Sequence, residues 1–195
     1  MAACICDSLA SFLPPCQGNQ PGGNYLKISI VPSCYIDTIT TIGGTGTDAN
    51  VISAITLDTV NNPGAIWYTI DARKDTVLTL EDQVVPGNFV NQTISFTIAN
   101  YSNNIDKETA AQEQSDFVNL LVSSTEGFVI VARDKSGTRK LYGATNPLYV
   151  TVMQKTSGTV TTDLAGTSLT FSEAQPVLAP ALEFAVGGTG LIPGK

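Results

Sequence analysis

The chain has 195 residues, of which 43% are hydrophobic and only 14% charged, and its formal net charge is −7 at pH 7. Its ten basic residues are scattered along the sequence. This argues against direct binding of nucleic acid, because such binding needs clustered Lys and Arg. The sequence contains no histidine, which excludes Ser-His-Asp and Cys-His catalysis and most zinc or copper sites.

The first 24 residues read as an irregular N-terminal arm, interrupted by Pro14-Pro15 and Gly22-Gly23. Apolar residues such as Leu9 and Phe12 predict that this arm lies against a neighbouring subunit. The segment lacks the basic start and long apolar run of a secretion signal, and no stretch approaches the length of a membrane span. We therefore expect synthesis in a cytoplasm and no membrane association.

All four cysteines lie near the start of the chain, at Cys4, Cys6, Cys16 and Cys34. Their spacing is not that of a standard zinc site. Disulfides are the second alternative, in an oxidising compartment. For a cytosolic product, we favour the third interpretation, in which all four are free thiols that behave as small apolar residues.

Alternating polar and apolar residues, bounded by turn signals, predict a β domain over residues 25–173. The predicted strands cover residues 25–31, 35–42, 51–57, 65–72, 77–80, 89–101, 128–133, 138–142, 149–154 and 169–171. One helix is predicted over 106–123, with Asn103-Asn104 as candidate caps and an apolar stripe through Phe117, Val118 and Leu121. Gly127 is a plausible stop after its last turn.

The last stretch, residues 174–195, is rich in proline and apolar residues and has neither strand nor helix periodicity. We expect it to be a C-terminal arm that docks on a neighbouring subunit, and the alternative is docking across its own domain. The predicted interface residues are apolar and lie in both arms: Pro176, Val177, Leu178, Leu182, Phe184, Leu9 and Phe12.

No residue pattern indicates catalysis, a cofactor or a bound metal. Gly43-Gly44-Thr45-Gly46 lacks the Lys of a phosphate loop and precedes a strand. The acidic residues between Asp71 and Asp82 are interpreted as a solvated face rather than a carboxylate pair for glycoside hydrolysis. The sequence therefore predicts a protein that is not an enzyme.

Several motifs, taken in order, resemble those of bacteriophage tail tube proteins. The resemblance begins at Cys4 and Cys6 and continues through a β meander and a single helix to the strand at Phe128-Val129-Ile130-Val131. It ends with Asp163-Leu164-Ala165-Gly166 and Leu169-Thr170-Phe171, its most characteristic part. The chain departs from the resemblance in its extended apolar C-terminus after Glu173.

The resemblance implies a mainly β protein, an antiparallel β-sandwich or small barrel with one packed helix. It implies hexameric rings that stack into the tube of a virion tail, through which DNA passes as cargo without specific binding. It also implies contacts with other tail proteins, namely a terminator, a baseplate or hub, and a tape measure. Acidic residues would line the lumen, and Asp58, Asp71 and Asp134 are the candidates.

Two other classes of protein fit the same sequence. One is another virion component, either a connector ring or a capsid decoration protein. The other is a secreted binding domain with an uncharged surface, which would stay monomeric and would need an export signal.

Overall fold

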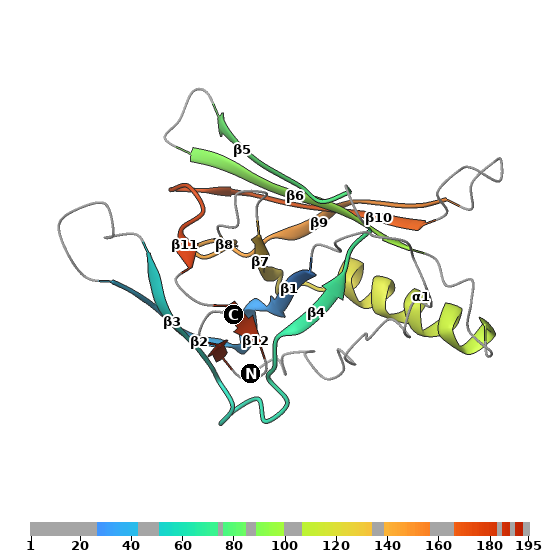
Figure 1. The fold of residues 1–195 in the computed structure, drawn as a ribbon, viewed down its shortest axis with the longest axis horizontal. Helices are drawn as coiled ribbons and strands as arrows, with labels where there is room; N and C mark the ends of the chain where they lie inside the picture. The colour runs from blue at the N-terminus through green and yellow to red at the C-terminus, as the bar shows by residue number, and fades with distance from the viewer. Residues whose placement is uncertain are drawn as a thin grey trace.

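The computed structural model describes residues 27–42, 51–73, 76–84, 89–99, 107–133, 139–156, 166–182, 185–187 and 190–192. In this part of the chain, the strands form two facing layers, accompanied by one α-helix (Figure 1). The prediction of a mainly β sandwich with a single packed helix is therefore confirmed. The N-terminal arm predicted for residues 1–24 lies outside the described residues.

The larger layer is a seven-stranded sheet. Its strands, in spatial order, are β2 (Ile36–Thr41), β3 (Ile52–Leu57), β11 (Ala181–Leu182), β8 (Arg139–Tyr142), β7 (Phe128–Arg133), β1 (Lys27–Pro32) and β4 (Tyr68–Asp71). A 3-10 turn, Ser33–Tyr35, joins β1 to β2.

The second layer is a four-stranded antiparallel sheet in the order β5 (Leu78–Val84), β6 (Phe89–Ala99), β10 (Gly166–Gln175) and β9 (Tyr149–Thr156). A separate short hairpin pairs β12 (Ala185–Gly187) with β13 (Gly190–Ile192). The helix is α1 (Lys107–Ser123).

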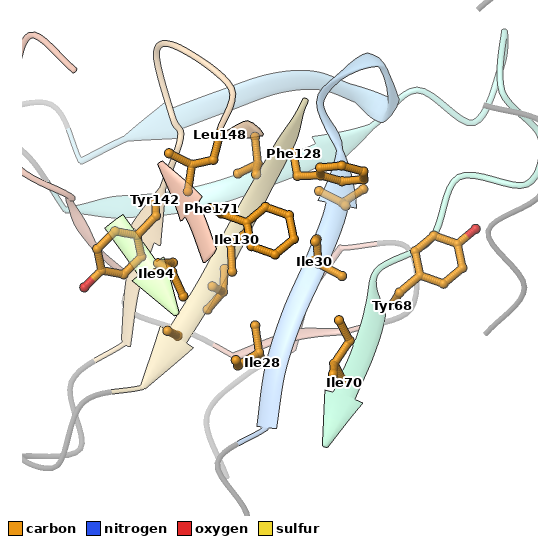
Figure 2. Packing of buried hydrophobic residues seen from close by; sticks show 14 of the residues in the cluster. Ile28, Ile30, Tyr68, Ile70, Ile94, Phe128, Ile130, Tyr142, Leu148 and Phe171 are labelled. Carbon is orange, nitrogen blue, oxygen red and sulfur yellow. The ribbon is translucent and has the colours of Figure 1, made fainter. Parts of the chain in front are cut away.

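The core lies between the two sheets and follows the alternation of side chains along their strands. In β6 the buried residues are Gln92, Ile94, Phe96 and Ile98, and the residues between them are partly exposed. From the larger sheet, Ile28, Ile30, Ile70 and Ile130 point into the same core (Figure 2). The strand β7 is buried on both faces, which explains its continuous apolar run.

Aromatic side chains join the two layers at the centre of this core. Phe171 of β10 is fully buried and stacks on Phe96 of β6, with ring centroids 5.7 Å apart. It also meets Phe128 of β7 edge-on at 5.8 Å. Phe171 thereby connects both sheets (Figure 2).

The helix α1 buries one stripe and exposes the rest of its described surface. Gln114, Phe117, Val118 and Leu121 are buried at the spacing of an amphipathic helix. Gln114 and Val118 of this stripe line a small cavity together with residues of β9 and β10. The helix lies beside these strands (Figure 1). The helix begins and ends within one residue of the prediction.

Two buried glutamines hold the loop after β8 and the segment after β10. The amide oxygen of Gln92 accepts the backbone N–H of Gly143 at 3.0 Å, and its nitrogen donates to the carbonyl of Val177 at 3.1 Å. Gln175 makes a similar pair of bonds with the backbone N–H and carbonyl of Asn146. Gly143 has a φ of 78°, a conformation that side chains rarely adopt.

Replacing Gln92 by leucine is expected to destabilise the fold by about 2–4 kcal/mol, because the buried N–H of Gly143 and the partly buried carbonyl of Val177 would both lose their partner. Urea denaturation measures the change. Gln83→Leu is the matched control, because Gln83 is exposed on β5. Equal stabilities for the two variants would show that the Gln92 bonds do not hold the segments together.

The structure differs from the sequence prediction at the C-terminal boundary, placed after residue 173. The strand β10 continues to Gln175, and Ala179 and Leu182 are buried within the same chain. Leu182 was predicted to lie in a subunit interface, but β11 inserts it between β3 and β8. The reason is that β3 and β8 leave a gap in the larger sheet, and the returning chain fills it and buries its apolar side chain.

The interpretation of all four cysteines as free thiols is wrong for Cys34, which is disulfide-bonded. The other cysteines lie outside the described residues. Cys34 lies in the turn between β1 and β2. Sequence spacing does not report which thiols come within bonding distance in the folded chain, so the pairing could not be predicted.

The disulfide predicts the outcome of a thiol titration. In denaturant without reductant, at most two of the four cysteines should react with a thiol reagent, whereas all four should react after reduction. Four reactive thiols in the unreduced protein would contradict the disulfide at Cys34.

Candidate assembly surface

The four-stranded sheet is open at both edges among the described residues, because neither β5 nor β9 pairs with a second strand there. Each strand of this sheet is antiparallel to its neighbour. With four strands, β5 and β9 therefore run in opposite directions. An open edge exposes unpaired backbone N–H and carbonyl groups that can bind another strand.

The edge strand β9 carries little charge and no proline, although its pairing with β10 is irregular between Val150 and Val152. Of its eight residues, only Val150 is partly buried, and Lys155 is the one charged residue. Val152 is 54% exposed and Met153 45% exposed, and they lie on opposite faces of the strand. Charge and proline are two of the means by which natural proteins protect free edges, so the regular part of β9 from Val152 to Lys155 is suited to pairing.

The outer face of this sheet carries a ladder of hydroxyl groups across β6 and β10. In each pair of opposed residues, the two side-chain hydroxyl groups are hydrogen-bonded, with their oxygens 2.9–3.0 Å apart. The pairs are Thr97 with Ser168, Ser95 with Thr170, and Thr93 with Ser172. This ladder was not predicted, although the alternation of Ser and Thr in both strands is its signal in the sequence.

Charge is nearly absent from this outer face. Among its described side chains, Asp82 of β5 is the only charged one. Leu78 and Leu80 of β5 are 58% and 43% exposed on the same face. The face therefore carries little charge, with paired hydroxyl groups at its centre and apolar side chains near both edges.

The turn between β10 and β11 exposes three of the predicted interface residues. Pro176 is exposed, and Val177 and Leu178 are 55% and 60% exposed. The turn lies beside β5, because the N–H of Ala179 donates to the Glu81 carboxylate at 2.6 Å. The remaining predicted interface residues, Leu9, Phe12 and Phe184, lie outside the described residues.

Glu81 connects this turn to the larger sheet. Its other carboxylate oxygen forms an ion pair with Lys140 of β8 at 2.7 Å, and both side chains are partly buried. The strand β5 is thereby fixed to the rest of the subunit through its inward-facing carboxylate, while its outer backbone edge stays open.

The acidic residues predicted for a lumen lie elsewhere in the fold. Asp58 follows β3 and accepts hydrogen bonds from the backbone and side chain of Asn61 at 2.9 and 2.8 Å, which lower the pKa of Asp58. Asp71 ends β4, and its Oδ1 is buried without a hydrogen-bond partner. Asp134 lies outside the described residues. The structure therefore does not bring Asp58 and Asp71 onto the face of the four-stranded sheet.

A small cavity lies between α1 and the inner side of β9 and β10. Its volume is about 50 Å³, and its lining includes Val118, Met153, Lys155 and Thr167. Pockets for small molecules usually measure roughly 300–1,000 Å³, so this one is too small for such a ligand.

The described residues show neither of two further features. They contain no group of three or more His, Cys, Asp or Glu placed to hold a metal ion. In the same part of the chain, no helix has both the length and the hydropathy that crossing a membrane requires.

Comparison of the chain with protein-family models, with curated proteins and with solved structures gives no match. The functional proposal therefore depends on the surfaces described above and on the motifs of the sequence.

Proposed function

We propose that this chain is a structural subunit that assembles into rings and stacked rings, as the tail tube of a bacteriophage virion does. The observation that carries the proposal is the four-stranded sheet with its two open, oppositely directed edges. The motifs that resemble tail tube proteins supply the specific form of the assembly.

The directions of the two edges favour a ring. When a copy is rotated about an axis that lies roughly along the strands, its β5 comes beside β9 of the first copy and runs antiparallel to it. The same contact then repeats around the ring, and a head-to-tail contact of this kind closes when the rotation closes. The low charge of β9 and its exposed Val152 and Met153 support burial in such a contact.

The outer face of the sheet supports a passage for DNA that does not bind it. Each hydroxyl pair of β6 and β10 uses one of its two O–H donors within the pair, so the ladder offers fewer free donors for phosphates than unpaired hydroxyl groups would. The face has no described basic side chain, and its one charge, Asp82, repels a polyanion. We propose that this face lines the conduit.

The proposed partners are further copies of the chain in hexameric rings, together with the terminator, baseplate or hub, and tape measure of a tail. The proposed location is the virion tail, and the proposal assigns no catalytic role to the chain. The exposed turn at Val177 and Leu178 is a proposed contact between subunits, because its apolar side chains are exposed.

Size-exclusion chromatography with light scattering, over a range of protein concentrations, tests the proposal. A tube subunit should give masses that rise through a ring to open-ended assemblies as the concentration increases. A connector would stop at one ring. A monomer at every concentration would favour a decoration protein or a secreted binding domain and would contradict the proposed function.

A further inference from the structure

We propose that the disulfide of Cys34 is a redox latch that ties the N-terminal segment of the chain to the turn between β1 and β2. When the latch is oxidised, it holds this segment on its own domain, and when it is reduced, it releases the segment. The proposal is independent of the assembly into rings, because the latch lies within one chain and is tested on the monomer.

The partner of Cys34 follows from the positions of the cysteines. Cys34 is disulfide-bonded in a structure that holds one chain, and that chain has three other cysteines. These are Cys4, Cys6 and Cys16, so the partner lies between 18 and 30 residues before Cys34. All three precede β1, which begins at Lys27. The disulfide therefore joins the N-terminal segment to a point beyond the first described strand.

The turn that carries Cys34 is fixed to two other parts of the domain, which makes it a firm anchor. The backbone N–H of Ser33 donates to the carbonyl of Gly127 at 3.1 Å, at the start of β7. The backbone N–H of Asp58 donates to the carbonyl of Tyr35 at 2.9 Å, from the connection after β3. The side chain of Cys34 is itself partly buried against the hydrophobic core. A segment bonded to Cys34 is thereby held at a fixed point of the fold.

Thiol–disulfide exchange opens the latch. The thiolate of one glutathione attacks a sulfur of the bond and displaces one cysteine thiolate. A second glutathione displaces the other cysteine, and the two glutathiones leave as their disulfide. The two cysteines thereby gain two electrons and two protons, which the two glutathione thiols supply.

The state of the latch follows the surroundings of the protein. Disulfides are rare in a reducing cytoplasm and persist in oxidising surroundings, so the latch is open in the first and closed in the second. The segment carries apolar residues, among them Leu9 and Phe12. The redox state of the surroundings thus decides whether these side chains stay with their own domain or can reach another molecule.

Trypsin separates the two sides of the proposed bond. Lys27 is the first basic residue of the chain and Arg73 is the second, so complete digestion yields the peptides 1–27 and 28–73. Cys34 lies in the second peptide, and the other three cysteines lie in the first. For mapping, the unreduced chain is unfolded, its free thiols are alkylated, and the monomer band is digested.

We expect mass spectrometry to find the peptides 1–27 and 28–73 joined by a disulfide in the unreduced monomer and separate after reduction. Two separate peptides without reduction would overturn the latch. Joined peptides that occur only in a covalent dimer would also overturn it, because the bond would then link two chains.

Limited digestion of the folded monomer with chymotrypsin tests the release of the segment. Phe12 is followed by Leu13 and provides a cleavage site within the segment. We expect cleavage after Phe12 to be severalfold faster after reduction with dithiothreitol, because a segment that is not held by the domain is more open to a protease. Circular dichroism confirms that the domain stays folded.

Cys34→Ser is the control for this experiment, because it removes the latch and keeps the other three cysteines. This variant should be cleaved at the faster rate both with and without dithiothreitol. If the unmodified chain is cleaved at the same rate before and after reduction, the disulfide does not hold the segment and the proposal is wrong. A variant that is cleaved as slowly as the oxidised chain would overturn it as well.

Discussion

The variant Val152→Glu is expected to remain a folded monomer at concentrations at which the unmodified chain assembles. Val152 lies on the free edge strand β9 and is 54% exposed, so the substitution should change the stability of the subunit by no more than about 0.5 kcal/mol. In the proposed ring, the new carboxylate would be buried in the contact between β9 and β5 of the neighbour, where it would lose its hydration. A charge on an edge strand is also a common means by which proteins prevent edge pairing.

The control for this prediction is Val60→Glu, which makes the same chemical change at a position that is 86% exposed in the turn after β3. This variant should assemble as the unmodified chain does. Light scattering measures the mass of both, and circular dichroism confirms that both are folded. Normal assembly of Val152→Glu would contradict a role of β9 in the contact.

The variant Phe171→Ala is expected to lose about 3–5 kcal/mol of unfolding free energy, the largest effect on stability that we predict. Phe171 is fully buried and contacts Phe96 in its own sheet and Phe128 in the other. Its removal would leave a cavity between the layers. The melting temperature should fall by roughly 6–20 °C for a domain of this size.

Phe89→Ala is the matched control for this substitution, because Phe89 begins β6 and is 51% exposed. Its cost should stay below about 1 kcal/mol. Denaturant unfolding, at a concentration at which both variants are monomeric, measures the difference. Equal costs for the two substitutions would show that Phe171 does not join the layers.

Much of the fold could be predicted because local patterns determine it. The strand β7 was predicted with its observed bounds, since its apolar run is buried on both faces and its sequence is flanked by Gly127 and by the turn signal Asp134-Lys135-Ser136-Gly137. The strand β10 was predicted as three residues but runs from Gly166 to Gln175. Its outward-facing residues Ser168, Thr170 and Ser172 are polar, and they obscured the strand pattern when read without the partner strand β6.

Other features depend on contacts between distant parts of the chain, and the sequence does not display them. The two residues of β11 form a strand only because β3 and β8 leave a gap for them. Val177 and Leu182 are both apolar and lie close in sequence, yet one is exposed and the other is buried in that gap.

The candidate surface was predicted only in part for the same reason. Assembly was inferred from the low charge of the whole chain, whereas the open edges follow from the spatial order of β5, β6, β10 and β9. No pattern within one strand reveals which strand lies at an edge. Asp82, the acidic residue on the outer face, was interpreted at the sequence level as part of a solvated face rather than as a lumen residue.

Electron microscopy of the purified and concentrated protein tests most directly the claim that this chain builds a tube. We expect rings and hollow rods whose wall is one subunit thick, with a lumen bounded by the four-stranded sheets. A field of single particles of monomer size, at concentrations well above those reached in chromatography, would contradict the claim.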